Sequence, residues 1–345
     1  MKIIVASTVV PLIEGGGTFI VDWLVEKLNA YGHQATALKI PFSSHYRQMI
    51  SQMLALRLYH IEDACDRLVC VRTPSYLLKH PDKRLWFIHH YREVYDLWDT
   101  ELSGMPRDAE ALAIREYIMR ADETAFSESK QIYANSQIVS RRLMEFNGVE
   151  SMPLYPPLLH PEQFYTDGYG DTIYYPSRVN TTKRQLLAVE AMRFVKTDVK
   201  LLLTGRSEQP GYADRIHQCI HQYRLEKKVT FRDEWISEKE KADLFSKCLC
   251  ALYIPIDEDS YGYPSLEAHQ SRKAVITCTD SGGTSELIMD DDNGYIVEPN
   301  ARTLAASFDR MFEEKHNAER MGQRGLERIE ELGINWDHVV EAFTL

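Results

Sequence analysis

Residues 254–297 read IPIDEDSYGYPSLEAHQSRKAVITCTDSGGTSELIMDDDNGYIV, and this stretch decides the fold class. Its segment SYGYPSL, residues 260–266, carries the glycine and proline of a turn that opens onto a helix. The apolar run at residues 274–277 has the length and composition of a buried parallel strand. A second turn at Gly282 and Gly283 precedes another short helix. Strands that alternate with helices predict an α/β domain built on a parallel sheet.

The same stretch places two carboxylates beside a helix start. The first backbone N–H groups of a helix have no partner within the helix, and such groups bind anions. Asp259 and Glu267 stand eight positions apart around the first turn, and carboxylates accept hydrogen bonds from hydroxyl groups. This combination suits a ligand made of phosphate and sugar. Two ordinary strand–helix loops with helix caps would give the same pattern, and the stretch alone leaves both interpretations open.

Composition excludes several classes of protein. The 345 residues suffice for two domains, and the net charge of −11 argues against a nucleic-acid-binding protein. The six cysteines have neither CxxC nor zinc-type spacing, which indicates a reducing compartment. The N-terminal MKIIVAST reads as a strand rather than a signal peptide, and no apolar run approaches the roughly 20 residues that span a bilayer. We expect a cytoplasmic protein, with a peripheral position at the inner face of the membrane left open.

The first half, residues 1–160, reads as one α/β domain. A short strand leads into Gly15, Gly16 and Gly17 and then into an amphipathic helix. A glycine-rich turn before a helix lets a pyrophosphate approach the backbone, although a flexible turn is the alternative. The loop is not G-x-G-x-x-G and lacks the acidic ribose-binding partner. A nicotinamide-dependent oxidoreductase is therefore a weak interpretation.

Two further features of this domain are candidates for function. A predicted strand ends at residue 88 and is followed by His89 and His90, at the edge where open α/β sheets bind ligands. Either histidine could act on a substrate hydroxyl, and helix capping or packing is the alternative. The predicted helix at residues 46–61 carries Arg47 and Arg57. It suits a core-facing position better than a membrane surface, and the second option stays open.

The second half is organised in the same way. The proline-rich residues 153–161 predict a linker, residues 161–325 a second α/β domain, and residues 326–345 a terminal segment that crosses back onto the first domain. Arg178 and Lys183 lie in a loop and helix start after its first strand. Two cations near helix N-termini suit a leaving diphosphate, and such fixed charge can replace a divalent metal. We therefore expect no metal, although the run at residues 257–259 resembles a D-x-D metal motif.

Taken together, the motifs resemble those of retaining glycosyltransferases of family 4. Such enzymes have the GT-B fold, which consists of two Rossmann-like doubly wound α/β domains that face a central cleft. The resemblance covers nearly the whole chain and rests on the following segments: the Gly15–Gly17 loop, WFIHH at 86–90, IYANSQIVSRRL at 132–143 with YPP at 155–157, SRVNTTK at 177–183, DSYGYPSLEA at 259–268 and SGGTSELI at 281–288.

The resemblance implies a role for each candidate residue. Arg178 and Lys183 would bind the donor's diphosphate, Glu267 the ribose hydroxyls and Asp259 the donor sugar. His89 would lie near that sugar, with His90 as the alternative. The implied catalytic residues are His89, Asp259, Arg178 and Lys183, and the implied donor-binding residues are Gly16, Gly17, Arg178, Lys183, Gly205, Asp259, Gly262, Tyr263, Pro264, Ser265, Leu266 and Glu267.

The resemblance also implies an activity. It is the transfer of a hexose-type sugar from a UDP- or GDP-sugar to a hydroxyl of a saccharide or lipid-linked glycan acceptor. The reaction would retain configuration by a front-face mechanism without metal or cofactor. Peripheral membrane contact through the N-terminal domain stays open. Two departures from the family pattern are Asp259 in place of glutamate and Ser177 in place of glycine. A nucleotide-sugar epimerase or phosphorylase and a non-catalytic nucleotide-sugar binder are the alternatives.

Overall fold

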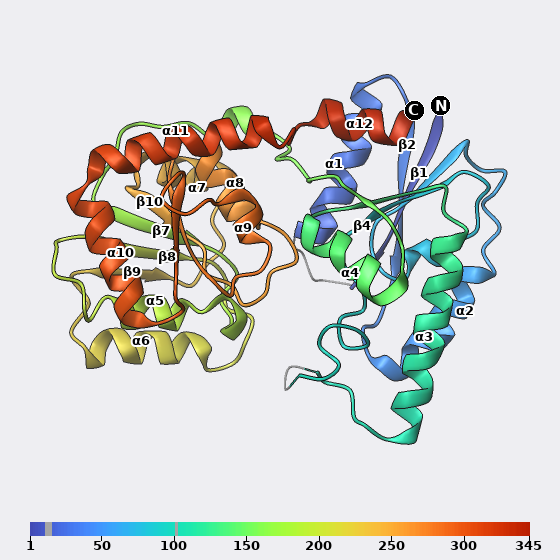
Figure 1. Cartoon of the computed structure of the whole chain (residues 1–345), viewed down its shortest axis with the longest axis horizontal. Helices are drawn as coiled ribbons and strands as arrows, with labels where there is room; N and C mark the ends of the chain where they lie inside the picture. Colours follow the sequence, from blue (N-terminus) through green and yellow to red (C-terminus); the bar gives the residue numbers. More distant parts are fainter. Residues whose placement is uncertain (11–15, 101–102) are drawn as a thin grey trace. The chain divides into compact units, whose positions relative to one another are not determined.

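The computed structural model describes residues 1–10, 16–100 and 103–345 as two α/β units (Figure 1). The first unit contains Met1–Pro156 and Asn335–Leu345, and the second contains Pro157–Ile334. Each unit holds a six-stranded sheet in which the paired strands run parallel. The predicted α/β class with two doubly wound domains is confirmed.

The first sheet has the strand order β2-β1-β3-β4-β5-β6. Its strands are β1 (Lys2–Val9), β2 (Gln34–Pro41), β3 (Arg67–Cys70), β4 (Lys83–Phe87), β5 (Gln131–Ala134) and β6 (Met152–Pro153). The helices of this unit are α1 (Gly16–Ala30), α2 (Tyr46–Arg57), α3 (Ala109–Ser127), α4 (Gln137–Asn147), α12 (Trp336–Thr344) and the short η1 (Ser75–Leu77). The chain moves outward from β1 in both directions, so the strand order reverses between β1 and β3.

The terminal helix α12 is part of the first unit. The ring of Trp336 meets that of Trp86 edge-on, at 6.4 Å between centroids. Arg67 Nη1 donates to the carbonyl oxygen of Phe343 at 2.7 Å, and Arg84 Nη1 donates to that of Ala342 at 2.7 Å. Two guanidinium groups therefore satisfy carbonyl groups at the negative end of the helix, which stabilises its attachment.

The core of the first unit contains a fully buried carboxyl group. Asp122 in α3 accepts hydrogen bonds from Tyr76 Oη and Tyr95 Oη, both at 2.9 Å. Burial raises the pKa of Asp122 to about 7, and the two tyrosine hydroxyls oppose that rise. A carboxyl whose pKa is higher in the folded chain stabilises the fold below its ordinary pKa. That contribution is lost as the pH rises through 7.

We therefore expect the stability of Asp122→Asn relative to wild type to increase as the pH rises. The unfolding free energy of the variant relative to wild type should increase by about 2–3 kcal/mol between pH 5 and pH 8, because only the wild type loses its buried proton. Urea unfolding followed by tryptophan fluorescence measures this, since Trp23, Trp86, Trp98 and Trp336 lie in the first unit. Glu116→Gln on the exposed side of α3 is the control. A pH-independent difference for Asp122→Asn would contradict the assignment.

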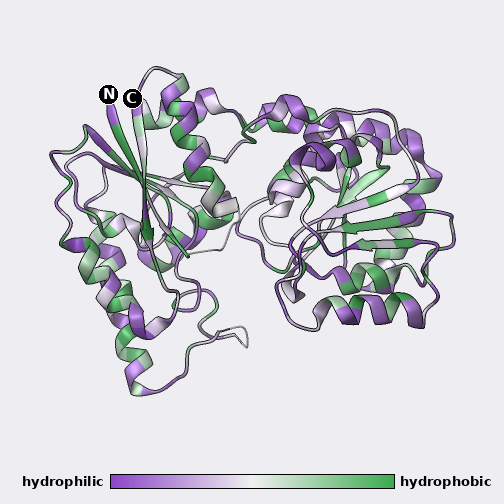
Figure 2. Cartoon of the chain, turned by 180° about the vertical axis from the view of Figure 1, so that it is seen from behind, coloured by the Kyte–Doolittle hydropathy of each residue, from purple (hydrophilic) through white to green (hydrophobic). Residues whose placement is uncertain are grey.

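The second sheet has the order β12-β11-β10-β7-β8-β9. Its strands are β7 (Thr172–Pro176), β8 (Lys200–Thr204), β9 (Val229–Arg232), β10 (Cys250–Leu252), β11 (Val275–Cys278) and β12 (Gly294–Val297). The helices are α5 (Gln185–Ala191), α6 (Tyr212–Gln222), α7 (Glu238–Lys247), α8 (Tyr263–Gln270), α9 (Thr284–Leu287), α10 (Ala301–Glu313), α11 (Lys315–Glu331), η2 (Pro161–Gln163) and η3 (Thr181–Lys183). Figure 2 shows mainly hydrophobic strands and helices with hydrophilic outer residues.

The unit boundaries can be set beside those expected from the sequence. The chain enters the second unit between Pro156 and Pro157, within the proline-rich residues 153–161. It returns to the first unit at Asn335, whereas the expected terminal segment began at residue 326. The difference arises because α11 continues to Glu331 and packs along α8 of the second unit.

Candidate functional site

Most of the predicted site residues lie at one edge of the second sheet. Arg178 and Lys183 follow β7, the acidic residues 257–259 follow β10, and the turn at Gly282 follows β11. Because these strands are parallel and adjacent, their carboxyl ends meet at the same edge. The fold therefore brings together loops that are separated by about a hundred residues of sequence.

Lys183 is the central cation of this edge. It ends η3, where Asn180 caps the helix by accepting from the Lys183 backbone N–H at 3.1 Å. The buried Lys183 ammonium donates to Tyr253 Oη at 3.0 Å and forms an ion pair with Glu258. Burial alone would raise the pKa of the Glu258 carboxyl, but Lys183, Tyr253 and Arg178 together outweigh this effect and lower the pKa. Tyr253, whose Oη donates to Glu258 at 3.0 Å, completes the cluster.

Glu258 is not among the residues that the sequence predicted. The motif spacing selected Asp259, yet the structure brings Glu258 into contact with Lys183, and Asp259 lies half-buried next to it. Three consecutive acidic residues at 257–259 gave no sign of which one turns toward Lys183. The loop conformation decides this, with Asp257 in the left-handed region at φ 43°.

Arg184 fixes the loop that carries these carboxylates. Its guanidinium donates to the carbonyl oxygens of Ile254 at 2.7 Å and Pro255 at 2.8 Å, and it pairs with Asp280 at 2.7 Å. The backbone N–H of Gly283 adds a hydrogen bond to the Glu258 carbonyl oxygen at 2.8 Å. Arg184 therefore ties the loop after β10 to the loop after β11.

The start of α8 lies directly against the Lys183 cluster. Gly262 precedes α8 at φ 72°, and a Cβ there would lie 2.1 Å from Cε1 of Tyr253. Only glycine allows this approach. None of the described side chains caps the helix start, and its first turn contains no acidic residue. The predicted residues 263–266 form this first turn, whose backbone N–H groups lie near the Lys183 ammonium, an arrangement suited to phosphate.

Glu267 lies one turn further along α8 and is buried. Lys241 Nζ in α7 holds its Oε1 at 2.6 Å and also contacts Glu238 Oε2 at 2.9 Å. Burial raises the pKa of Glu267, and Lys241 partly offsets that rise. Within the described residues no hydrogen bond reaches Glu267 Oε2. One carboxylate oxygen is thus fixed and the other is available, and the sequence gave no sign of Lys241.

Arg178 and Gly205 lie at the ends of β7 and β8. Gly205 has φ 146°, and a Cβ there would lie 1.8 Å from the Ser177 carbonyl oxygen, so glycine is needed for the close approach of the two loops. The half-exposed Arg178 pairs with Glu208 at 3.0 Å. Glu208 also accepts from Asn180 Nδ2 at 2.8 Å. Both predicted diphosphate-binding cations are therefore matched by a carboxylate in this structure.

The remaining predicted residues belong to the first unit. His90 is buried, its Nε2 lies 2.8 Å from Asn147 Oδ1, and burial lowers its pKa to about 4. It is a packing residue beside Phe87. His89 is half-buried with Nδ1 2.6 Å from the His90 carbonyl oxygen, so of the two histidines it is the one with an accessible ring. Gly16 and Gly17 begin α1, whereas Gly15 lies outside the described residues.

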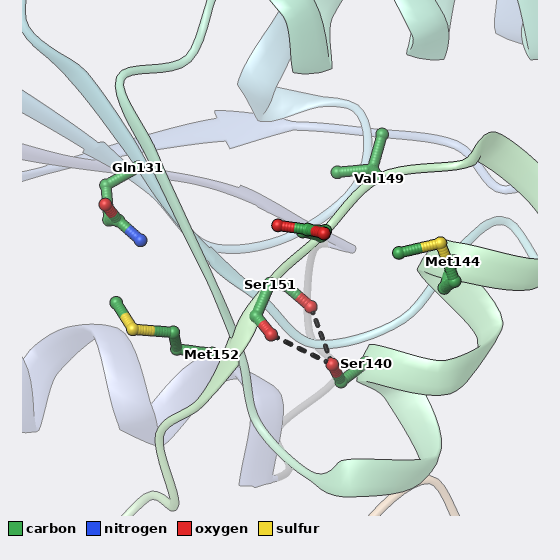
Figure 3. Close-up of a pocket in the computed structure, with 7 residues that line it drawn as sticks. Gln131, Ser140, Met144, Val149, Ser151 and Met152 are labelled. Atoms are coloured by element: carbon green, nitrogen blue, oxygen red, sulfur yellow. Dashed lines mark hydrogen bonds between the residues drawn. The ribbon is translucent and has the colours of Figure 1, made fainter.

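A cavity of about 530 Å³ lies away from all of these residues (Figure 3). It is formed by the start of β5, α4 and the segment leading into β6, and its lining residues are Gln131, Ser140, Met144, Val149, Glu150, Ser151 and Met152. Ser151 Oγ donates to Ser140 Oγ at 2.9 Å on its wall. Its lining has no cation and includes none of the predicted site residues.

Residues 1–10, 16–100 and 103–345 offer neither a metal centre nor a membrane span. They contain no group of three or more His, Cys, Asp or Glu side chains placed to hold a metal ion. None of the helices in these described ranges is both long enough and apolar enough to cross a bilayer.

Sequence comparison relates the second unit to known proteins. Residues 162–328 match the family described as "Glycosyl transferases group 1". The chain is 29% identical over 126 residues to alpha-1,3/1,6-mannosyltransferase ALG2 from Dictyostelium discoideum, which covers 36% of this chain and 29% of that protein. For human ALG2 the identity is 29% over 173 residues, covering 45% and 40%. The matches span less than half the length of these relatives.

Structural comparison covers the whole chain. Sucrose-phosphate synthase from Thermosynechococcus elongatus superposes with a TM-score of 0.76 at 18% identity, covering 98% of this chain and 96% of that one. HepE from Anabaena, solved in complex with UDP, gives a TM-score of 0.73 at 13% identity and covers both chains completely. At such low identity these likenesses establish a common fold.

Proposed function

Since the chain has the GT-B fold and its residues 162–328 belong to the group 1 glycosyl transferases, we propose that it transfers a sugar from a nucleotide-sugar donor to a hydroxyl group. One observation carries the proposal. The Lys183 ammonium contacts Tyr253, whose ring packs against Gly262 at the start of α8, and Glu267 stands one turn further along the same helix. Positive charge for a diphosphate and a carboxylate for ribose hydroxyls thus occur at the spacing of one helical turn.

The donor's diphosphate binds to Lys183 and to the first N–H groups of α8 in this proposal. Glu267 Oε2 accepts from the ribose, while Lys241 fixes Oε1 and so orients the carboxylate. Glu258 pairs with Lys183, and Glu208 pairs with Arg178. The doubly charged diphosphate competes with these single carboxylates for both cations. The carboxylates therefore hold the cations in place before the donor arrives.

The proposed reaction is the front-face transfer that the family resemblance implies. The bond between the sugar's anomeric carbon and the diphosphate breaks, and the acceptor oxygen forms a new bond to that carbon on the same face. The acceptor proton passes to an oxygen of the leaving phosphate. Lys183, Arg178 and the start of α8 stabilise the charge of the departing diphosphate, so these groups take the part that a divalent metal plays elsewhere. His89 and Asp259 would contact hydroxyls of the donor sugar.

The donor is a UDP- or GDP-linked hexose in this proposal. HepE was solved with UDP, and the ALG2 relatives are mannosyltransferases, which favours a hexose and leaves the base to experiment. The acceptor would be a saccharide or a lipid-linked glycan. A thermal-shift comparison of UDP with GDP identifies the base, because a bound ligand raises the melting temperature.

A second assay separates the proposed transferase from its alternatives. Nucleoside diphosphate should leave the nucleotide sugar only when a glycan acceptor is present, and nuclear magnetic resonance should show that the product keeps the donor's anomeric configuration. Conversion of the donor without an acceptor would identify an epimerase or a phosphorylase acting on phosphate. Donor binding without conversion under any condition would identify a binding protein.

We propose that exposed leucines of the first unit make peripheral membrane contact. At the end of α2, Leu54 is 50% exposed and Leu58 is 74% exposed, and Leu112 of α3 is 49% exposed. We expect the double variant Leu54→Glu/Leu58→Glu to sediment less with vesicles of phosphatidylcholine and phosphatidylglycerol, because charged side chains oppose insertion into the lipid interface. Met152→Glu, an equally exposed position in the same unit, is the control. Equal sedimentation of the double variant and wild type would contradict membrane contact through this surface.

A further inference from the structure

Arg72 occupies a special place in the first unit. It follows the carboxyl end of β3, two residues after Cys70. In this sheet the strand order reverses between β1 and β3, and open α/β sheets bind their ligands where the order reverses. Helix α1 begins after β1 at the same edge, and its first turn contains no acidic residue. No motif includes Arg72, so the sequence did not single it out.

The guanidinium group of Arg72 is half-buried and stands apart from other charges. Among the residues that the structure describes, no carboxylate pairs with it and no oxygen accepts a hydrogen bond from it. Burial lowers the pKa of Arg72, and no charge among the described residues contributes to that shift. Burying a guanidinium group without an anionic partner removes part of its hydration and destabilises the fold. Arg47, Arg57 and Arg67 of the same unit, in contrast, all have carboxylate partners.

The backbone around Arg72 is firmly fixed. Its carbonyl oxygen accepts from the Ser75 backbone N–H at 2.8 Å and from Ser75 Oγ at 2.6 Å. The next carbonyl oxygen, that of Thr73, accepts from Thr8 Oγ1 at the end of β1 at 2.6 Å. The Cα of Arg72 is therefore held in place at the ligand-binding edge while its charged end has no partner in the described part of the chain. A prearranged cation of this kind is suited to bind an anion.

We propose that Arg72 binds a phosphate group of one of the two substrates. The group is either the diphosphate of the nucleotide sugar or a phosphate carried by the acceptor, and the inference rests on the proposed function for these two sources. The planar guanidinium matches two phosphate oxygens at once, which a neutral saccharide hydroxyl cannot replace. Binding of that substrate would then depend on its phosphate group, which Arg72 contacts at the edge of the first unit.

Calorimetric titration of the full chain tests this proposal with two probes. The first is the nucleoside diphosphate, UDP or GDP, titrated alone. The second is inorganic pyrophosphate, titrated while the nucleoside diphosphate is saturating. We expect Arg72→Gln to weaken one of these two bindings at least about tenfold, the loss of one charge-assisted contact. Arg72→Lys, which keeps the charge but loses the planar fork, should fall between wild type and Arg72→Gln.

Arg47→Gln is the matched control, because Arg47 is an exposed arginine of the same unit that pairs with Glu110. Weaker nucleoside diphosphate binding in Arg72→Gln assigns the donor as the source, and weaker pyrophosphate binding assigns the acceptor. The melting temperature of Arg72→Gln should equal or exceed that of wild type, since no ion pair within the described residues is lost. Unchanged affinity for both probes, or a lowered melting temperature with lost affinity, would overturn the proposal.

The outcome is distinguishable from a failure of the proposed function. If neither UDP nor GDP binds the wild-type chain, the donor site in the second unit is wrong. Pyrophosphate titrated alone then still tests Arg72. If nucleotide binding is lost in Lys183→Met but unchanged in Arg72→Gln, the proposed function stands, and the pyrophosphate titration decides the inference.

Discussion

Lys183→Met should lower the rate of sugar transfer at least about a hundredfold. Lys183 contacts Tyr253, whose ring packs at the start of α8, and in the proposed site it stabilises the charge that develops as the diphosphate leaves. Removing one preorganised charge partner of a transition state typically costs about 10²–10³ in turnover. Methionine keeps the length and the apolar stem of the side chain, so the change is confined to the charge. Acceptor-dependent release of nucleoside diphosphate, measured under saturating donor, gives the rate.

This variant also leaves Glu258 without its cation. The loss should lower the stability of the second unit by about 1.5–3 kcal/mol, the usual contribution of a hydrogen bond between charged groups. The double variant Lys183→Met/Glu258→Gln removes the unpaired charge and should regain stability without regaining activity. Lys200→Met, which removes an exposed lysine of β8, is the control. A Lys183→Met enzyme with near-wild-type turnover would contradict the site.

Glu267→Gln should weaken binding of the nucleoside diphosphate by about a hundredfold. Hydrogen bonds to a charged group contribute about 1.5–3 kcal/mol each, and two ribose hydroxyls would lose this acceptor. Glutamine has nearly the same shape, and Lys241 keeps Glu238 as a partner, so packing around the site changes little. Calorimetric titration with the preferred nucleotide measures the loss.

A 2′-deoxynucleoside diphosphate makes this test specific for the ribose contact. Wild type should bind the deoxy form more weakly than the ribose form, because Glu267 loses one hydroxyl donor. Glu267→Gln should distinguish the two forms much less, because the hydroxyl has lost its charged acceptor. If Glu267→Gln and wild type discriminate equally between the two sugars, Glu267 does not bind the ribose.

The sequence predicted much of this site because local rules govern it. Turn residues and apolar runs located the strands, and the carboxyl ends of adjacent parallel strands must share an edge. The order of strands and turns along the chain is therefore enough to place Lys183, Gly262 and Glu267 near one another. Gly262 is one example. The chain needs a positive φ just before α8, and glycine is the residue that adopts it most readily, so the sequence marks this position.

The contact partners of Lys183 and Glu267 could not be predicted from the sequence. Lys183 pairs with Glu258, a contact that no motif predicted, because the backbone conformation at Asp257 sets which acidic side chain faces Lys183. Lys241 reaches Glu267 from α7, a contact that depends on how two helices pack. Long-range pairs of this kind leave no periodicity or motif.

Two further properties of the candidate residues depend on how the folded chain surrounds each side chain. The neighbouring His89 and His90 are equivalent in the sequence, yet the second is enclosed by aromatic rings and the first is half-exposed. Arg72 could not be told from other arginines, because its distinguishing property is the lack of a partner in the described structure. Neither property can be read from residue type or spacing.

The most direct test of the donor site is titration of UDP and of GDP into the wild-type chain and into Lys183→Met. The proposed site predicts that one of the two nucleotides binds wild type with one-to-one stoichiometry. It also predicts that the affinity falls at least about tenfold in Lys183→Met, the loss of one charge-assisted contact, and is unchanged in Lys200→Met. If neither nucleotide binds wild type, or if Lys183→Met binds as tightly as wild type, the second unit does not contain the proposed nucleotide-sugar site.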